Sequence, residues 1–320
     1  MRIGSRGSAL ALAQARFVAD RLQVGRLGDV EIVTVTTSGD RRARGGDKSR
    51  WVDAIEDALL AREIDVAVHS AKDLPGELAA GLTLLGGPAR AAPEDALCGA
   101  RRPGDPAGSG GLDGPGELGG LEGLAEGARV GTSSIRRRAQ LRAAREDLDI
   151  VLLGGNVDTR LRKLARGDFD AIVLARAGLQ RLAREDAIGA VLDPARFVPA
   201  PGQGMLALEA RADDAATREA AAAILDSDAT ACLLAERALA RALDASCHTP
   251  LGAHAAPAGC DCLLLRAWIG LPDGSAWVAD ELLGGFYDPE SLGARVAERM
   301  RAAGAAELLA RAQEMAVAGA

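Results

Sequence analysis

The residues best suited to chemistry lie in the stretch 66–75, which reads Val-Ala-Val-His-Ser-Ala-Lys-Asp-Leu-Pro. The apolar run 66–68 predicts a short buried strand, and Pro75 ends regular structure. Between them we expect a polar loop that carries His69, Ser70, Lys72 and Asp73. An acid and a base at the end of a strand suit the ligand crevice of an α/β sheet. Taken alone, the stretch fits a surface turn better, with Asp73 bonding its own backbone.

Three junctions between a predicted strand and a predicted helix carry groups that bind anions, because a helix N-terminus offers free N–H groups and positive partial charge. The first junction carries Arg6 and Ser8, and the third carries Asn156 and Arg160. The second carries the largest set: Thr132, Ser133, Ser134, Arg136 and Arg137. Arginine suits carboxylates, since its planar fork donates to both oxygens. We expect one or two of residues 136–138 to face a cleft, and Arg181 to join them. For any single arginine, pairing with a nearby acid or with solvent is the favoured interpretation. Together they predict a ligand with many carboxylates.

Cys247 lies in the stretch 245–252, after a predicted helix, among small and polar residues that favour an accessible thiol. By contrast, Cys98 and Cys232 have apolar neighbours and are expected to be inert. A zinc site is a weaker alternative, because C-x-C and adjoining Cys-His spacings suit zinc poorly. Its ligands would be Cys247, His248, His254, Cys260 and Cys262. We therefore expect no metal.

The elements that position these groups repeat as strand, loop and helix. Strands are predicted at 2–5, 30–37, 66–68, 82–85, 96–99, 129–130, 150–153 and 170–174, and helices at 9–22, 52–62, 135–144, 157–166 and 177–185. The Gly-rich segments 38–50 and 101–127 are expected to be irregular. Such alternation implies parallel sheets covered by helices.

Two such blocks predict two α/β domains with a cleft between them, and 199–209 is expected to cross back to the first. From Asp226 the pattern changes to a helix through Leu243, a loop, strands at 263–269 and 277–282, and a final helix from Pro289. We predict three domains: 1–97 with 200–222, 98–199, and a smaller α+β domain at 223–320.

The bulk composition excludes several functions. With 320 residues, a net charge of -7 and no P-loop or dinucleotide fingerprint, the chain is not expected to bind nucleic acid. No apolar run is long enough for a bilayer, so no membrane association is expected. Five cysteines without disulfide spacing fit a reduced cytoplasm. No exposed apolar stripe stands out, so a monomer is expected.

Five motifs together resemble one family. They stand in the order found in hydroxymethylbilane synthases, also called porphobilinogen deaminases: VAVHSAKDLP (66–75), GTSSIRR (131–137), GNVDTRL (155–161), PAPGQG (199–204) and the Cys247 loop. The similarity runs from Arg2 to the final helix and is interrupted only by 101–127. The resemblance implies two α/β domains of the type II periplasmic-binding-protein kind and a third domain.

The resemblance also implies an activity and the residues that perform it. Cys247 would hold a dipyrromethane cofactor through a thioether, and Asp73 would assist loss of ammonia from porphobilinogen and stabilise positive charge on pyrrole nitrogens. Four additions would precede hydrolysis to the linear tetrapyrrole. Cofactor carboxylates would meet Lys72, Thr132, Ser134, Arg136 and Arg137, and substrate would meet Arg6, Ser8, Arg160, Arg181 and Lys48. A non-catalytic polycarboxylate-binding module and a zinc-stabilised interaction domain are the alternatives.

The chain departs from the family pattern in three places. A family arginine is Gly154 here, the mobile-loop motif becomes Arg-Gly-Gly-Asp-Lys-Ser-Arg-Trp at 44–51, and two glycines before the cysteine become Ala245 and Ser246. If the last two positions need a positive φ, the loop must differ. None of these changes removes Asp73 or Cys247, so we expect an active enzyme.

Overall fold

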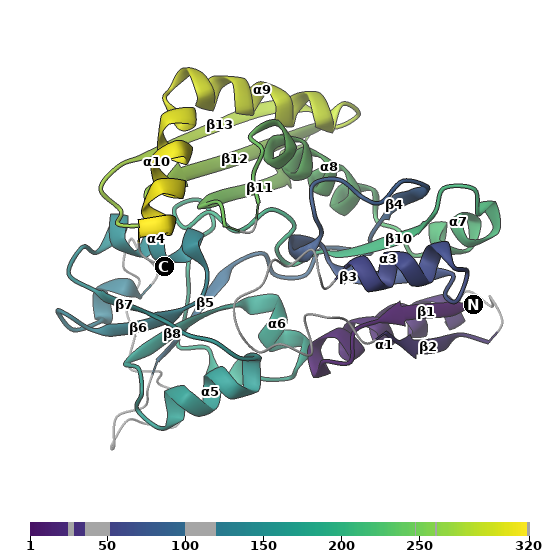
Figure 1. Ribbon diagram of the computed structural model, residues 1–320, viewed down its shortest axis with the longest axis horizontal. Helices are drawn as coiled ribbons and strands as arrows, with labels where there is room; N and C mark the ends of the chain where they lie inside the picture. Colours follow the sequence, from purple (N-terminus) through teal and green to yellow (C-terminus); the bar gives the residue numbers. More distant parts are fainter. Residues whose placement is uncertain (25–28, 36–51, 100–119, 247, 260, 319–320) are drawn as a thin grey trace.

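The computed structural model describes residues 1–24, 29–35, 52–99, 120–246, 248–259 and 261–318. The chain forms three sheets (Figure 1). The first has the order β2-β1-β3-β10-β4. Its strands are β1 (Arg2–Ser5), β2 (Glu31–Thr34), β3 (Val66–Ser70), β4 (Leu82–Gly86) and β10 (Leu206–Arg211). Its helices are α1 (Ala9–Val24), α3 (Asp53–Leu60) and α7 (Ala215–Ala222).

The second sheet repeats the plan of the first in the order β7-β6-β8-β5-β9. Its strands are β5 (Asp95–Gly99), β6 (Arg129–Thr132), β7 (Asp149–Leu152), β8 (Ala171–Ala175) and β9 (Ala190–Val191). Its helices are α4 (Ile135–Ala144), α5 (Val157–Ala165) and α6 (Arg176–Arg181), with short 3₁₀ turns at Leu121–Gly123 and Glu185–Ala187. In both sheets three parallel strands are followed by an antiparallel strand and an edge strand.

Each antiparallel strand joins the sheet of the other unit: β5 follows the strands of the first sheet along the chain but pairs in the second, and β10 does the reverse. Strand β5 directly follows the first block of strands, and β10 directly follows the second, so the chain crosses between the sheets at 87–94 and again at 199–205. The predicted parallel sheets are therefore mixed sheets, each with one antiparallel strand that the repeated strand–helix pattern does not show. The expectation that 199–209 crosses back to the first unit is confirmed, because β10 pairs with β3 and β4.

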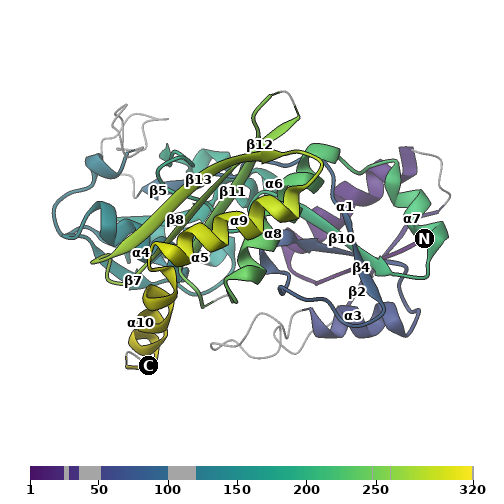
Figure 2. The same cartoon turned by 90° about the horizontal axis from the view of Figure 1, so that it is seen from above.

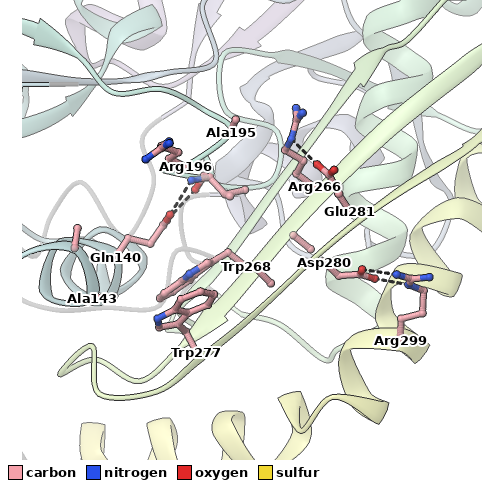
Figure 3. A pocket seen from close by; sticks show the side chains of 14 residues that line it. Gln140, Ala143, Ala195, Arg196, Arg266, Trp268, Trp277, Asp280, Glu281 and Arg299 are labelled. Atoms are coloured by element: carbon pink, nitrogen blue, oxygen red, sulfur yellow. Dashed lines mark hydrogen bonds and ion pairs between the residues drawn. The ribbon is translucent and has the colours of Figure 1, made fainter. Parts of the chain in front are cut away.

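The third sheet is antiparallel in the order β11-β12-β13, from β11 (Leu251–Pro257), β12 (Cys262–Gly270) and β13 (Trp277–Gly285). One face meets the second sheet's helix α4, with Trp268 on the strand side and Gln140 on the helix side (Figure 3). Trp268 packs there with Ala139 and Val198. The other face carries α8 (Ser227–Ala242) and α9 (Pro289–Ala302), and α10 (Ala305–Ala318) follows (Figure 2). This layout confirms the predicted fold class, two α/β units and a smaller α+β unit.

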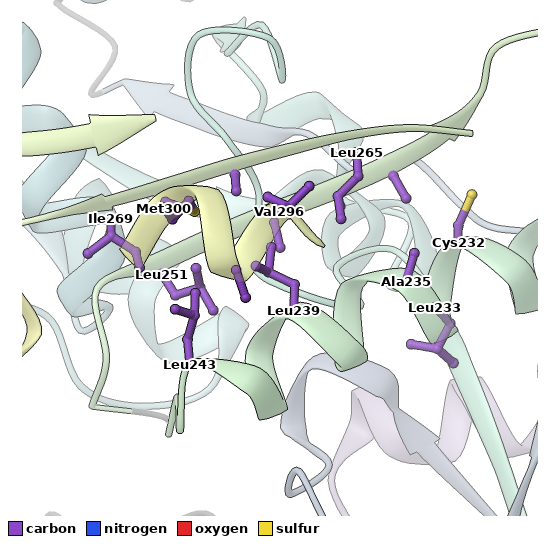
Figure 4. Packing of buried hydrophobic residues seen from close by; sticks show 14 of the residues in the cluster. Cys232, Leu233, Ala235, Leu239, Leu243, Leu251, Leu265, Ile269, Val296 and Met300 are labelled. Atoms are coloured by element: carbon purple, nitrogen blue, oxygen red, sulfur yellow. The ribbon is translucent and has the colours of Figure 1, made fainter. Parts of the chain in front are cut away.

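The core of the third unit follows from the strand period of two. Leu263, Leu265 and Ile269 of β12 are fully buried, while Leu264 and Arg266 between them are only half-buried. The buried set packs against Leu239 and Val296 of the covering helices (Figure 4). Because this core fixes the C-terminal end of α8, it also fixes where the Cys247 loop begins.

Most predicted elements exist, with shifted ends. Strand β3 runs to Ser70 rather than Val68, the helix after β8 ends at Arg181, and the final helix is divided by Gly304, which has a φ of +98°. Strand β11 was not predicted, since Leu-Gly-Ala-His-Ala-Ala-Pro has few residues with strand propensity and forms a strand through tertiary pairing. Helix α7 was also not predicted. Within the described ranges, no helix is long and apolar enough to span a bilayer.

Candidate active site

Asp73 lies in a short 3₁₀ turn, Ala71–Asp73, that follows β3 directly. The N–H of Ala71 donates to the carbonyl of Met205 at 3.1 Å, which ties the turn to the second crossover. Gly202 of the PAPGQG motif approaches the same turn: a Cβ on Gly202 would lie 2.9 Å from the carbonyl carbon of Ala71 and from the nitrogen of Lys72. The motif therefore packs directly against the backbone of the turn that carries Lys72 and Asp73.

His69 does not belong to this turn, so that expectation is wrong. It lies within β3, is buried, and its Nε2 is 2.9 Å from Oε2 of Glu209 on β10. Ser70 ends the strand and exchanges hydrogen bonds with the side chain of Gln14 on α1. Side chains alternate along a strand, and the apolar prefix 66–68 was too short to show that the strand continues.

A cavity of about 310 Å³ adjoins the turn and is lined from all three units. Its walls include Lys72 and Asp73 after β3, Ser134 and Arg136 at the start of α4, Arg237 of α8, and Ser246 and Thr249 after α8. This volume lies at the lower end of the usual range for ligand pockets, roughly 300–1,000 Å³. The structure thus brings Asp73, Arg136 and the described residues on either side of position 247, Ser246 and Thr249, to one pocket.

Cys247 and Lys48 lie outside the described residues, as does the altered loop 44–51. Two hydrogen bonds join the residues on either side of position 247: the Ser246 N–H donates to Oγ1 of Thr249 at 2.9 Å, and the Thr249 N–H donates to the Ser246 carbonyl at 3.0 Å. The left-handed conformation after α8 falls on Asp244, with a φ of +50°, and Ala245 and Ser246 are not among the positive-φ residues. Their replacement of two glycines therefore introduces no backbone strain.

Helix α4 presents Arg136 and Arg137 to different surroundings. The N-cap Ser134 accepts from the N–H of Arg137, and Oγ1 of Thr132 accepts from the N–H of Ser134 at 3.1 Å. Arg136 lines the cavity; its Nη1 donates to the Val198 carbonyl at 2.8 Å, and its Nε is buried without a hydrogen-bond partner among the described residues. Both arginines also contact Asp95: Nη2 of Arg136 lies 2.8 Å from its Oδ2, and Arg137 donates to its Oδ1 at 2.7 and 3.0 Å. Arg137 donates once more, to the Val173 carbonyl, and does not line the cavity.

Arg160 and Arg181 are cations with neutral partners. Arg160 donates to the Gly155 carbonyl at 2.7 Å and to Oγ of Ser133 at 2.9 Å, and Arg181 donates to the Gly204 carbonyl at 2.8 Å. Across the described part of the chain neither has a carboxylate partner. Burial lowers the pKa of each guanidinium to about 10, with Arg137 adding to the effect on Arg160. An anionic ligand would relieve that penalty.

Arg6 and Ser8 stand at the start of α1. The Oγ of Ser8 accepts from the N–H of Ala11 at 3.2 Å, as an N-cap does. This end of α1 meets α6, because a Cβ on Gly178 would lie 3.9 Å from Leu10 (Figure 1). The anion-binding end of α1 thus lies at the junction of the two α/β units.

Arg237 is a cavity residue that the sequence did not reveal. It is 7% exposed, its Nη2 donates to the Gly76 carbonyl at 2.8 Å, and its Nε is buried with no hydrogen-bond partner in the described ranges. Burial lowers its pKa. The sequence of α8 mixes apolar and charged residues as many surface helices do, so nothing in it marks Arg237 as different. Only the fold shows that Arg237 faces the cavity beside Asp73.

A larger cavity, about 730 Å³, lies between α4 and the third sheet (Figure 3). Trp268 and Trp277 line it, but two of its three arginines are already paired with acids: Arg266 with Glu281 at 3.0 Å, and Arg299 with Asp280 at 2.6 Å. A carboxylate would have to displace these acids. The smaller cavity is therefore the better candidate for a polycarboxylate ligand.

The remaining cysteines and histidines show no reactive arrangement. Burial raises the pKa of Cys98 and of Cys232 to about 12, so both thiols are inert, as predicted. Burial also lowers the pKa of His254 to about 3. His254 pairs across the sheet with Arg266, four residues from Cys262, which corresponds to about 13 Å. No metal-binding group of three occurs in the described ranges, which omit Cys247 and Cys260.

Comparison with known proteins identifies the family. The model "Porphobilinogen deaminase, dipyromethane cofactor binding domain" matches residues 1–219, and "Porphobilinogen deaminase, C-terminal domain" matches residues 230–302. The chain belongs to the porphobilinogen deaminase family. This membership confirms the resemblance drawn from the five motifs.

Curated porphobilinogen deaminases match along nearly the whole chain. The protein of Deinococcus radiodurans is 43% identical and covers 98% of both chains, and that of Roseiflexus sp. is 45% identical, covering 96% of this chain and 98% of its own. Among solved structures, immunogenic lipoprotein A of Vibrio vulnificus is 14% identical with a TM-score of 0.41, covering 70% of this chain and 94% of its own. The Bordetella pertussis BvgS VFT2 domain is 17% identical with a TM-score of 0.38, covering 69% and 83%.

Proposed function

We propose that this chain is a hydroxymethylbilane synthase, a transferase of tetrapyrrole biosynthesis. It joins four porphobilinogen molecules head to tail with loss of ammonia, on a dipyrromethane bound to Cys247, and then releases the linear tetrapyrrole by hydrolysis. The observation that carries the proposal is the cavity shared by Asp73, Arg136 and the Ser246–Thr249 turn. A non-catalytic polycarboxylate-binding module has no use for a carboxylate in that cavity, and the family match does not favour it.

The residues present fit the cofactor. The buried, unpartnered Nε of Arg136 is a donor that a ligand carboxylate would satisfy, and the cavity wall on either side of position 247 is polar. We assign the hold on the cofactor to Cys247, Lys72, Thr132, Ser134, Arg136 and Arg137. When bound, dipyrromethane supplies the pyrrole carbon to which the first substrate is joined.

Asp73 is assigned the catalytic role. Its carboxylate can hold a proton for the departing amine and, when ionised, stabilise positive charge on a pyrrole nitrogen. The 3₁₀ turn fixes the backbone of Asp73 against Gly202, so its carboxylate needs little reorganisation. Substrate carboxylates are assigned to Arg6, Ser8, Arg160, Arg181 and Lys48, with Arg237 added from its place in the cavity wall.

The organisation of the chain follows the same proposal. We place the domains at 1–94 with 200–222, 95–199, and 223–320; the first boundary moves from 97 to 94 because all of β5 pairs in the second sheet. We propose a monomer in the cytoplasm that binds neither nucleic acid nor membrane. The described cysteines, Cys98, Cys232 and Cys262, are free thiols, which suits a reducing compartment.

The test is an intact mass spectrum of the purified protein together with porphobilinogen turnover. The wild type is expected to carry the extra mass of a dipyrromethane and to consume porphobilinogen. Cys247→Ser is expected to lack both the extra mass and turnover, whereas Cys262→Ser, at a half-buried thiol in β12, keeps both. A wild type with neither property would favour the binding module instead.

A further inference from the structure

Asp95 is a buried carboxylate that none of the assigned roles uses. It is the first residue of β5, has no exposed surface, and lies where the first crossover enters the second sheet. Its Oδ2 is 2.8 Å from Nη2 of Arg136, and its Oδ1 accepts from Nε and Nη2 of Arg137 at 3.0 and 2.7 Å. Burial alone would raise the pKa of Asp95, yet the two arginines hold it at about 2. Asp95 is therefore ionised.

Asp95 also contacts the second crossover. Nε2 of Gln203 donates to Oδ1 of Asp95 at 2.9 Å and to the Pro93 carbonyl at 2.7 Å. Nε of Arg90 donates to the Gln203 carbonyl at 3.0 Å, and the N–H of Ala91 donates to the Gly204 carbonyl at 3.1 Å. The two segments that join the α/β units are thus bonded to each other, and Asp95 bonds them to α4.

We propose that Asp95 is the positioning residue of the carboxylate site: it sets the orientation of Arg136 and Arg137 and links that orientation to the two crossovers. The inference rests on the proposed function, because it assumes that these arginines meet ligand carboxylates. Two guanidinium groups this close repel each other, and one carboxylate between them reduces their joint charge from two to one. Without it, a pair of buried like charges would separate or draw in water.

The hydrogen-bond count shows why Asp95 can position Arg136 without blocking it. A guanidinium has five N–H donors. Arg136 donates one to the Val198 carbonyl, its Nη2 forms an ion pair with Oδ2 of Asp95 at 2.8 Å, and its Nε stays without a hydrogen-bond partner in the described structure. Asp95 and Val198 therefore fix the plane of the group while donors remain for a ligand. A fixed plane matters because bidentate recognition of a carboxylate depends on orientation.

The experiment compares Asp95→Asn with Asp149→Asn. The first keeps the shape of the side chain and removes its charge; the second removes an exposed carboxylate of the same sheet, 3.9 Å from Arg129. The fraction carrying cofactor is measured by intact mass, and kinetics are expressed per loaded molecule. We expect Asp95→Asn to raise the KM for porphobilinogen at least tenfold with kcat within threefold, and Asp149→Asn to change neither.

Gln203→Met serves where Asp95→Asn does not fold, since it leaves the Asp95 carboxylate in place and removes the Gln203 side-chain bonds to Asp95 and to the Pro93 carbonyl. We expect it to raise KM at least threefold with kcat preserved. A wild-type KM in loaded Asp95→Asn, or in Gln203→Met if the first variant is unfolded, overturns the inference. If loaded Asp95→Asn instead has a kcat at least tenfold lower and an unchanged KM, the inference is also overturned. Failure of the proposed function is seen separately, as absence of turnover in the wild type.

Discussion

Gly202→Ala is the sharpest test of how the fold places Asp73. Gly202 has a φ of +73°, and a Cβ there would meet the carbonyl carbon and Cβ of Ala71 and the nitrogen of Lys72, each at 2.9 Å. These are two backbone atoms and a Cβ of a buried turn, so they cannot rotate away as the end of a flexible side chain can. The added methyl must therefore displace the Ala71–Asp73 turn, which lines the cavity.

The size of the effect follows from two costs. A left-handed φ costs an L-residue about 1–2 kcal/mol, and overpacking adds about 1–3 kcal/mol. Gly167 provides a matched control: its φ is +78°, but a Cβ there meets nothing within 4 Å. Gly167→Ala therefore carries only the first cost. The unfolding entropy of a 320-residue chain is about 0.7 kcal/mol/K, so the difference between the variants, about 1–3 kcal/mol, corresponds to a Tm lower by about 1.5–4.5 °C in Gly202→Ala.

Activity separates the placement of Asp73 from mere loss of stability. A displacement of about 1 Å in a reacting group costs roughly 100-fold in rate. We expect Gly202→Ala to lose about that much kcat well below its Tm, with cofactor still attached, while Gly167→Ala keeps wild-type kcat. If the two variants had the same Tm and the same kcat, the contact between Gly202 and the turn would not be what positions Asp73.

Three further predictions concern single residues. Asp73→Asn should keep porphobilinogen binding by calorimetry but lower kcat at least about 100-fold; near-normal turnover would exclude the assigned role. Gly154→Arg should fold, since a Cβ there meets nothing within 4 Å, and should lower KM up to about fivefold by restoring a charged contact worth about 1 kcal/mol at an exposed site; an unchanged KM would show that the contact is already supplied. Burial beside the Glu209 carboxylate raises the pKa of Glu56 from 4.5 to about 7. Its contribution to stability is therefore complete below pH 4.5 and lost as pH rises through 7, by up to roughly 3 kcal/mol. Glu56→Gln should remove that fall in urea denaturation, and an identical pH dependence would contradict the sign.

The sequence carried the local part of this structure. Helix α4 has its predicted bounds because Ser134 caps it and good helix formers follow. Three of the motifs, which carry Asp73, Arg136 with Arg137, and Arg160, lie where β3, β6 and β7 end, as the strand–helix pattern predicted. The residues that contact these groups in the folded protein could not be predicted from the sequence. Asp95 meets Arg136 and Arg137 from a strand about 40 positions earlier, and no local pattern marks such a pairing. Arg237 lies in the cavity wall for the same reason, through tertiary packing.

The two crossings of the chain also impose an order on folding. The strands of the second sheet are continuous in sequence, from Asp95 to Val191, so that sheet can close as soon as its own residues have been synthesised. The first sheet cannot, because β10 lies between β3 and β4 and arrives only with Leu206–Arg211. Until then β2, β1 and β3 can pair with one another, but β4 has no strand to pair with. The open edges of β3 and β4 could then pair with other nascent chains. During synthesis the second sheet could thus form completely before the first sheet, although the first sheet begins at the N-terminus.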